Sequence, residues 1–347
     1  MNLQIIALLG QDGISSGAIY ALVALSIILV FSVTRILLIP LGEFVAFSAL
    51  TMAAIQAGRA TIGWLILALA LAALLADLCA ALRQRGQGRR MALSWRLFAM
   101  PCYAVVLVLL LAALPLQSLP MALQALLTLA AITPMGPLLY RLFFQPVANA
   151  SGLLLMIIAI AVHVSLVGVG LLVFGPEGMR TEPFSDGALE LGFISLNSQT
   201  IWVLLVSVAL ILALYVVFGR TLYGKALRAT AVNRLGAQLM GISPALAGKV
   251  TFSMAAFMCA LSGILIAPLT TLYYDSGFII SLKGFVGAII GGLASYPVAA
   301  IGAVAVGLIE SFSTFWASSY KEVIVFTLIL PFLMWRSFKS GDREEEH

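Results

Sequence analysis

The chain has 347 residues, of which 62% are hydrophobic and only 10% are charged, and its formal net charge is +5. A water-soluble domain of this size is about half apolar and about a quarter charged, so the composition excludes a soluble globular protein. The excess of basic residues is therefore no sign of nucleic-acid binding. We expect an all-α, polytopic protein whose main partner is the lipid bilayer.

Apolar stretches long enough to cross a bilayer follow one another along the whole chain. We predict helices at 13–34, 42–58, 62–82, 97–115, 119–142, 152–174, 200–218, 251–272, 278–294, 298–317 and 321–338. The segments 42–58 and 278–294 are the weakest, because they are short and carry a glycine or a charge near one end. The expected fold is a single transmembrane domain over residues 1–347, with about 10–11 segments, some of them broken or re-entrant.

The basic residues predict an orientation. Cytoplasmic loops of membrane proteins are enriched in Lys and Arg. If the N-terminus is outside and each segment crosses once, 15 of the 19 basic residues lie inside: Arg35, Arg83, Arg85, Arg89, Arg90, Arg96, Arg141, Arg220, Lys225, Arg228, Arg234, Lys249, Arg336, Lys339 and Arg343. We therefore expect the N-terminus outside and the C-terminus in the cytoplasm.

Two apolar segments are interrupted by proline or glycine, LLIPLGEFVAF at 37–47 and SLKGFVGAIIGGLASYP at 281–297. Interrupted segments in separate parts of a membrane protein are typical of helices that line a transport pathway. Alternatively, the glycines only allow helices to pack closely, as in the spacings Gly13–Gly17 and Gly287–Gly291.

Ionisable side chains inside apolar segments are costly and hence functional candidates. Glu43 follows Pro40 and Gly42 at the expected helix break, so we consider it a candidate for the pathway. Glu310 could either bond to another helix or line the pathway. An ion pair with Arg83 is the favoured role of Asp77, and His163 is either a packed, hydrogen-bonded histidine or part of a proton relay.

Two polar loops stand between the apolar segments. Residues 175–200 form a net acidic, extracytoplasmic loop, which is either a solvated connection or a docking surface for an external partner. Residues 219–249 form a basic, cytoplasmic loop.

The cytoplasmic loop begins with GRTLYGKA at 219–226, one residue short of the phosphate-binding pattern G-x-x-x-x-G-K-[ST]. The hydroxyl that would bind magnesium is missing, because Ala226 occupies its position. The preceding apolar run is also long enough to span a bilayer, whereas a phosphate-binding loop follows a strand. We expect no nucleotide, no metal ion and no catalytic residue in this chain.

The rest of the loop has the pattern of a short amphipathic helix. Apolar residues recur every four positions at Leu227, Ala231, Leu235 and Leu239. Gly241 suits the end of that helix, and Ser243 followed by Pro244 suits the start of the next helix. Such a helix lies on the lipid surface or docks into a groove of a cytosolic partner, and the Ala-rich face favours the partner.

The stretch TLYGKALRATAVNRLGAQLMGIS resembles the cytoplasmic coupling loop of the bacterial ABC importer permeases for branched-chain amino acids. KGFVGAIIGGLASYPVAAIGA and GAIYALVALSIILVFSVTRI resemble two further segments of that family. Before the second segment, where the family has N-F-A-x-G-E, Gly42 and Glu43 match and the Asn does not.

The resemblance implies a permease subunit of the bacterial inner membrane that is not an enzyme and imports small amino-acid-like solutes. It implies two cytosolic ABC ATPases that bind ATP and magnesium, a second permease subunit, identical or a sister chain, and a periplasmic solute-binding protein. Branched-chain amino acids are the expected substrates, with urea, short amides and small carboxylates as alternatives. The rival from another class is an ion-coupled secondary transporter in which Glu43, Glu310 and His163 relay protons.

The resemblance also implies roles for individual residues. The residues expected to couple to the ATPase are Gly224, Lys225, Ala226, Arg228, Ala229, Asn233, Leu235, Gly241 and Ile242. The residues expected to line or gate the substrate pathway are Gly42, Glu43, Lys283, Gly291, Gly292, Ser295 and Glu310.

Overall fold

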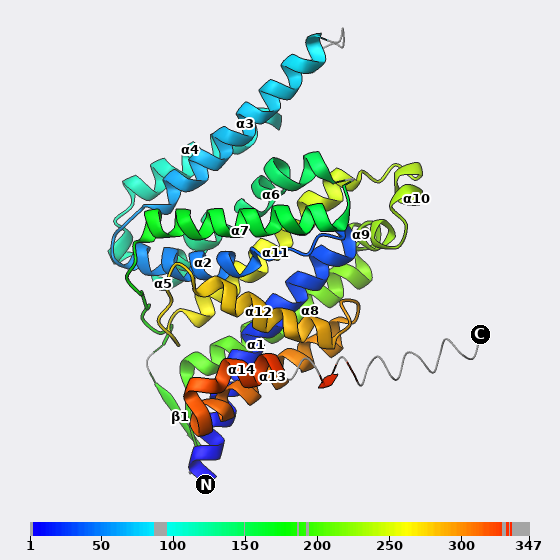
Figure 1. Cartoon of the computed structure of the whole chain (residues 1–347). Helices are drawn as coiled ribbons and strands as arrows, with labels where there is room; N and C mark the ends of the chain where they lie inside the picture. Colours follow the sequence, from blue (N-terminus) through cyan, green and yellow to red (C-terminus); the bar gives the residue numbers. More distant parts are fainter. Residues whose placement is uncertain are drawn as a thin grey trace, which may run out of the picture.

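The computed structural model describes residues 3–86, 96–148, 150–185, 187–191, 194–327, 331–332 and 334, which form a bundle of helices (Figure 1). The α-helices in these ranges are α1 (Leu3–Thr34), α2 (Leu41–Gln56), α3 (Ile62–Gly86), α4 (Arg96–Ala113), α5 (Met121–Ile132), α6 (Met135–Leu139), α7 (Gly152–Phe174), α8 (Ser198–Arg220), α9 (Leu222–Val232), α10 (Arg234–Leu239), α11 (Pro244–Ile266), α12 (Ser276–Ile290), α13 (Tyr296–Ala317) and α14 (Lys321–Thr327). Two strands, β1 (Ala188–Leu191) and β2 (Ile194–Asn197), pair antiparallel as a hairpin that the sequence did not predict.

Within the described ranges, seven helical stretches are long and apolar enough to cross a membrane: Gln4–Thr34, Ile62–Cys79, Met121–Val147, Gly152–Phe174, Ser198–Arg220, Pro244–Ile266 and Tyr296–Thr327. Three shorter apolar helices accompany them, at Leu41–Gln56, Phe98–Ala113 and Ser276–Ile290. The predicted segments from 13–34 to 298–317 each coincide with one of these helices. The predicted segment 321–338 begins in the same stretch as 298–317, and residues 328–330, 333 and 335–338 of it lie outside the described residues. The prediction of an all-α, multi-pass membrane protein is confirmed.

Some helix boundaries differ from the prediction for identifiable reasons. The segment predicted at 251–272 begins at Pro244, because Ser243 accepts a hydrogen bond from the Leu246 amide and Pro244 suits the first turn. The segment predicted at 119–142 is divided into α5 and α6, because Pro134 precedes α6 and lacks the amide that a continuous helix needs.

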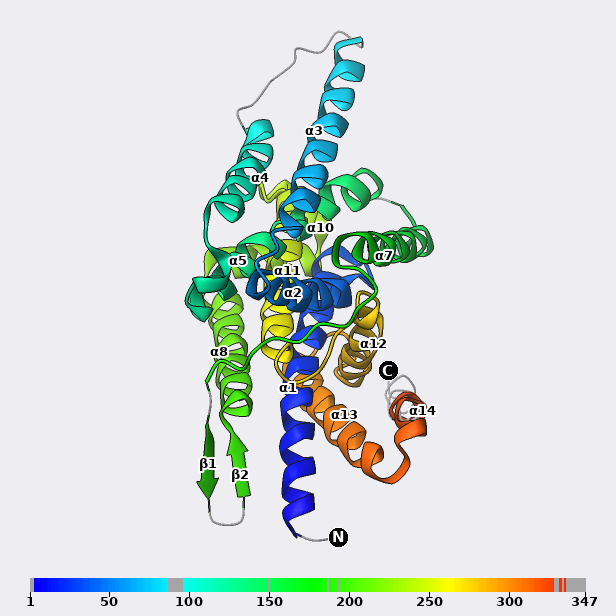
Figure 2. The same cartoon turned by 90° about the vertical axis from the view of Figure 1, so that its left-hand side faces the viewer.

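Helix α1 is the centre of the bundle and packs against α8, α11, α12 and α13 (Figure 2). Its contact with α13 is close because glycines face each other. A Cβ atom on Gly17 would lie 2.7 Å from the Cα of Val304, and one on Gly307 would lie 2.4 Å from the amide nitrogen of Gly17. Small residues of this kind let helix backbones approach in a membrane protein, where apolar burial alone gives no preference between lipid and protein.

Helices α12 and α13 pack in the same way. A Cβ atom on Gly287 would lie 2.7 Å from the Cβ of Ala303, and one on Gly291 would lie 2.6 Å from the Cβ of Ala299. The glycine spacings Gly13–Gly17 and Gly287–Gly291 therefore serve close helix packing, the second of the two interpretations left open by the sequence.

The two ends of α1 mark two different ends of the molecule. In both views its N-terminal end lies beside the β1–β2 hairpin, and α10 lies toward its opposite end (Figures 1 and 2). The side-chain amide of Gln11 donates a hydrogen bond to the hydroxyl of Thr200, 3.1 Å away, which ties α1 to the start of α8. The acidic loop at 175–200 and the basic loop at 219–249 are thus held toward opposite ends of α1.

Candidate functional site

The break between α1 and α2 is a non-helical segment, residues 35–40, in which Arg35 has a φ of +59° and residues 39–40 form a turn. The hydroxyl of Ser281 on α12 donates a hydrogen bond to the carbonyl oxygen of Ile39 at 3.0 Å. Immediately afterwards, α2 crosses α12 so closely that a Cβ atom on Gly42 would lie 1.8 Å from the carbonyl oxygen of Gly277. The helix break predicted in 37–47 is confirmed. It lets α2 begin directly against α12.

This crossing buries Glu43, whose exposed fraction is 0%. Nδ1 of His163 on α7 lies 2.9 Å from Oε1 of Glu43, within ion-pair distance but not aligned for a hydrogen bond. The ring of Phe278 covers the imidazole, with ring centroids 4.9 Å apart. A carboxylate in an apolar interior requires a nearby positive or hydrogen-bonding group, and here the imidazole is the nearest one. The sequence pointed to both residues but not to their pairing, because more than a hundred residues separate them.

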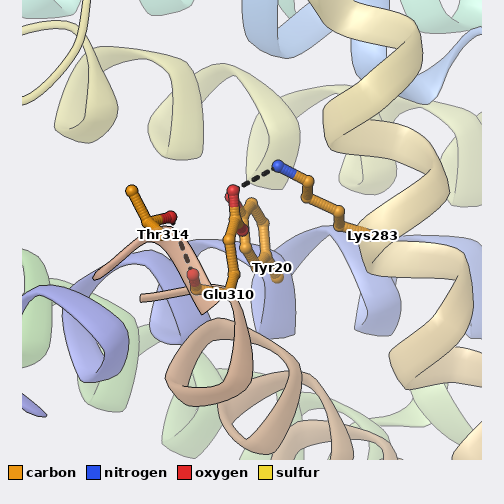
Figure 3. A network of polar contacts seen from close by, with 4 residues as sticks. All are labelled: Tyr20, Lys283, Glu310 and Thr314. Atoms are coloured by element: carbon orange, nitrogen blue, oxygen red, sulfur yellow. Dashed lines mark hydrogen bonds and ion pairs between the residues drawn. The ribbon is translucent and has the colours of Figure 1, made fainter. Parts of the chain in front are cut away.

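A second polar network joins α1, α12 and α13 (Figure 3). Nζ of Lys283 pairs with Oε1 of Glu310, and the hydroxyl of Tyr20 donates a hydrogen bond to Oε2 of Glu310 at 2.7 Å. The Lys283 ammonium also lies 5.5 Å from the centroid of the Tyr20 ring, within cation–π range. The hydroxyl of Thr314 donates a hydrogen bond to the main-chain oxygen of Glu310, at 2.8 Å, and not to its carboxylate. Two predicted pathway residues are thus brought together, and Tyr20 is a third member that the sequence did not single out.

The ionisable residues among the predicted pathway residues lie in two separate clusters. Lys283 and Glu310 line a cavity of about 620 Å³ that also borders α1 and α14. Glu43 belongs to the other cluster, with His163.

The remaining predicted pathway residues lie in the turn between α12 and α13. Gly292 has a φ of +66°, a left-handed conformation that glycine adopts without strain. The amide of Ser295 donates to the carbonyl oxygen of Gly291 at 3.0 Å, which closes the turn. These contacts explain why the turn contains glycines, and a role of Gly291, Gly292 and Ser295 in the pathway stays a prediction.

The coupling segment, residues 221–242, contains two helices where the sequence predicted one. Asn233 interrupts it with an extended backbone (φ −145°, ψ 101°) and caps α10 by accepting a hydrogen bond from the Gly236 amide at 2.8 Å. Gly224 lies in the first turn of α9, where a Cβ atom would meet the carbonyl oxygen of Val217 at 2.1 Å. Because a helix, α8, precedes GRTLYGKA, the segment has no strand before it of the kind that phosphate-binding loops follow.

The interruption divides the predicted apolar stripe between two surfaces. Leu227 is 3% exposed and packs with Val33 and Ala247, whereas Leu235 is 69% exposed. The segment's strongly exposed large apolar side chains are Leu222, Tyr223, Val232, Leu235, Leu239 and Met240. We call these six residues the coupling patch.

The other predicted coupling residues surround this patch. Lys225, Arg228, Ala229 and Asn233 are exposed, and Ala226 and Ile242 are half-buried. Gly241 has a φ of +81° and ends the segment, and the Ile242 amide donates to the carbonyl oxygen of Ala237 at 2.9 Å. The predicted C-terminal stop at Gly241 is confirmed.

Two arginines fasten the coupling segment to the bundle. Nη2 of Arg35 donates a hydrogen bond to the carbonyl oxygen of Ala231 at 3.4 Å. Nη1 of Arg234 donates to the carbonyl oxygen of Ala148 at 3.0 Å. Because Arg35 begins the non-helical segment 35–40, which leads to Glu43, the coupling segment touches one end of that segment directly.

The acidic loop is ordered by main-chain contacts over its first part. The amide of Met179 donates to the carbonyl oxygen of Leu272 at 2.9 Å, and that of Leu272 donates back at 3.0 Å. Nε of Arg180 donates to the carbonyl oxygen of Pro268 at 2.9 Å. At Met179 and Arg180 the acidic loop is thus attached to the segment that follows α11. Asp186 lies outside the described residues.

Asp77 forms the structural ion pair that the sequence favoured, with Arg141 as its described partner. Nε of Arg141 lies 3.2 Å from Oδ1 of Asp77. The side chain of Arg83, the partner expected from the sequence, lies outside the described residues.

Comparison with known proteins identifies the family. Residues 84–333 match the model of the family described as branched-chain amino acid transport system / permease component. This match covers more than half of the chain. The chain belongs to this family. The family resemblance noted from the sequence is confirmed.

Individual relatives of this permease family are more distant. The high-affinity branched-chain amino acid transport system permease protein LivH of Escherichia coli strain K12 is 28% identical over 203 residues, which are 56% of this chain and 65% of LivH. LivH of Salmonella typhimurium strain LT2 shows the same identity and coverage. BraD of Pseudomonas aeruginosa, also named as a high-affinity permease for these amino acids, is 26% identical over 243 residues, 67% of this chain and 79% of BraD. The chain thus spans slightly less than two thirds of LivH. No solved structure matches it.

Proposed function

We propose that this chain is the transmembrane permease subunit of an ATP-driven importer in a bacterial inner membrane, and that it moves branched-chain amino acids inward. The observation that carries the proposal is the coupling patch, an apolar surface held on two capped helices at one end of the bundle. A large exposed apolar patch rimmed by charges is typical of a protein–protein contact. Membership of the permease family supports the same role.

The coupling patch fits a groove on a cytosolic ATPase, with Lys225 and Arg228 at its rim. Two ATPases bind two permease subunits, identical or sister chains, and they hold the ATP and magnesium. The opposite end, with the N-terminus of α1 and the β1–β2 hairpin, faces the periplasm and receives solute from a binding protein. The C-terminus lies in the cytoplasm.

ATP binding draws the two ATPases together and moves the coupling segments with them. The hydrogen bond from Arg35 to Ala231 connects that movement to the non-helical segment 35–40 before α2. Since α2 and α12 meet at Gly42 and Gly277 without intervening side chains, the two helices shift together. This shift switches the pathway between outward and inward access.

One observation favours the rival function, ion-coupled secondary transport. Glu43 and His163 form a buried pair of titratable groups inside the bundle, the kind of pair that proton-coupled transporters use. In that case a transmembrane proton gradient, rather than ATP, would drive uptake.

Uptake of radiolabelled L-leucine into vesicles separates the two functions. We expect uptake by the purified chain only when ATPase subunits, solute-binding protein and ATP are present, with no loss when a protonophore collapses the gradient. Uptake without ATPase that the protonophore abolishes would establish the secondary transporter instead. Competition by urea, acetamide or short carboxylates in place of leucine would assign the alternative substrates.

A further inference from the structure

A cavity of about 620 Å³ lies between the N-terminal half of α1, the end of α11, α12, α13 and α14. Sites for small molecules commonly occupy about 300–1,000 Å³. Its wall includes Lys283 and Glu310, which Figure 3 shows pointing toward each other from α12 and α13. The cavity is thus large enough for a small solute, and the Lys283–Glu310 ion pair forms part of its wall.

The charged groups of this cavity are of both signs. Carboxylates come from Asp12, Glu310 and Glu322, and ammonium groups come from Lys283 and Lys321. Lys283 is only 5% exposed, so its charge requires an anion at close range. In the structure that anion is Glu310, which also accepts the hydrogen bond from Tyr20.

A different part of the wall is aliphatic. Ile266, Leu269, Leu272 and Ile280 line the cavity, and Ile266, Leu272 and Ile280 are nearly fully buried. A solute that fills the whole cavity therefore needs a positive group, a negative group and an apolar part. A neutral amide or urea would satisfy neither charge and would leave the aliphatic wall without a partner.

We propose that this cavity is a binding site for a zwitterionic α-amino acid with an aliphatic side chain, a proposal that rests on the amino-acid transport proposed above. The carboxylate of the solute binds Nζ of Lys283, its ammonium group binds the carboxylates of Glu310 and Asp12, and its side chain lies on the aliphatic wall. A zwitterion carries the same two charges as the Lys283–Glu310 pair. It can therefore replace each partner of that pair without leaving a buried charge unpaired.

Direct binding to the purified full chain in lipid nanodiscs tests the site. The probes are radiolabelled L-leucine, a photoreactive diazirine analogue of leucine, and two competitors that each lack one charge, 4-methylpentanoate and isopentylamine. We expect L-leucine to compete at least about tenfold better than either single-charge analogue, since each lacks one charge-assisted contact. The photoreactive analogue should label the segments around Leu269 and Ile280. Equal competition by the three compounds, or labelling confined to other segments, would overturn the proposal.

Variants separate binding from a purely structural ion pair. Lys283→Gln and Glu310→Gln should each weaken leucine binding at least about tenfold. The double variant Lys283→Glu/Glu310→Lys keeps an ion pair and hence the thermal stability, but it turns the solute so that its side chain leaves the aliphatic wall. Wild-type leucine affinity in this double variant would show that the pair is only structural. Asp77→Asn, which alters the ion pair with Arg141 outside the cavity, is the matched control and should bind normally.

Failure of this site and failure of the transport function give different results. Wild-type ATP-dependent leucine uptake in both single variants, with no label in the cavity, would overturn the site and leave the importer intact. Absence of any amino-acid uptake in the complete vesicle system would overturn the proposed transport function. The nanodisc measurements would then still show whether leucine binds in the cavity.

Discussion

Arg35 donates a hydrogen bond to the main-chain oxygen of Ala231, 3.4 Å away, and so joins the coupling segment to the non-helical segment 35–40 before α2. The two residues are 196 positions apart in the sequence. One belongs to the end of the central helix α1 and the other to the helix expected to meet the ATPase. In the proposed importer, this contact and the packing of Leu227 on Val33 link ATP-driven movement to the interior of the bundle.

Replacing Arg35 with Ala should weaken that link without unfolding the protein. A typical hydrogen bond contributes about 0.5–1.5 kcal/mol, and because this one is long and exposed it belongs at the low end, so leucine uptake per ATP hydrolysed should fall about two- to threefold. Uptake and phosphate release in the same vesicles give this ratio. Arg59→Ala, at the far end of α2, is the control and should leave the ratio unchanged. An unaltered ratio in Arg35→Ala would mean that movement reaches the bundle elsewhere.

Gly42→Ala should separate α2 from α12. Its Cβ atom would lie 1.8 Å from the carbonyl oxygen of Gly277, and main chain cannot move aside as a flexible side chain can. We expect a destabilisation of about 1–3 kcal/mol or more, seen as a lower midpoint of thermal unfolding in detergent. Gly168→Ala on α7 is the matched control, because nothing lies within 4 Å of its Cβ position. Equal midpoints for the two variants would contradict the close crossing.

The Glu43–His163 contact predicts coupled effects on stability. Glu43→Gln and His163→Ala should each lower the free energy of unfolding in SDS titrations. The double variant should lose less than the sum of the two, with a coupling energy of about 0.5–3 kcal/mol, because either change already removes the pair. Additive losses would show that the two side chains do not interact. Glu182→Gln, an exposed glutamate, is the control for removing a carboxylate.

Hydropathy located the helices because each apolar segment has to satisfy its own backbone hydrogen bonds in a bilayer, whatever its neighbours are. Hydropathy placed the start of α11 too late, at residue 251, whereas the capping signal at Ser243 and Pro244 predicted the start that the structure has. It also missed the β1–β2 hairpin, which lies in a loop between helices. Capping residues determine where a helix such as α11 begins, and the hydrophobicity of the segment carries little information about capping.

The site could be predicted residue by residue but not as pairs. Glu43, His163 and Glu310 were notable as ionisable groups in apolar segments, and Lys283 was expected in the pathway from the family resemblance. Which of them meet depends on the helix crossings at Gly42 with Gly277 and at Gly287 with Ala303, and these contacts join distant parts of the sequence. Likewise, the four-residue periodicity in 227–239 indicated one amphipathic helix, but the extended backbone of Asn233 turns Leu235 away from Leu227.

The two leucines of the coupling segment should therefore respond differently to truncation. Leu227→Ala removes a side chain that is 3% exposed and should lower stability by about 2 kcal/mol or more. Leu235→Ala removes one that is 69% exposed and should change stability by no more than about 0.5 kcal/mol. Thermal unfolding of the two variants in detergent compares them. A larger loss for Leu235→Ala would mean that the interruption at Asn233 is wrong.

The claim that the coupling patch transmits ATP-driven movement is tested most directly by Leu235→Asp in reconstituted vesicles. A carboxylate at the centre of an apolar contact should disrupt docking, while the exposed position lets the chain fold normally. We predict that Leu235→Asp retains the wild-type thermal midpoint and loses at least about tenfold in ATP-dependent leucine uptake and in co-purification with the ATPase. Wild-type uptake and co-purification in this variant would contradict the coupling role of residues 221–242.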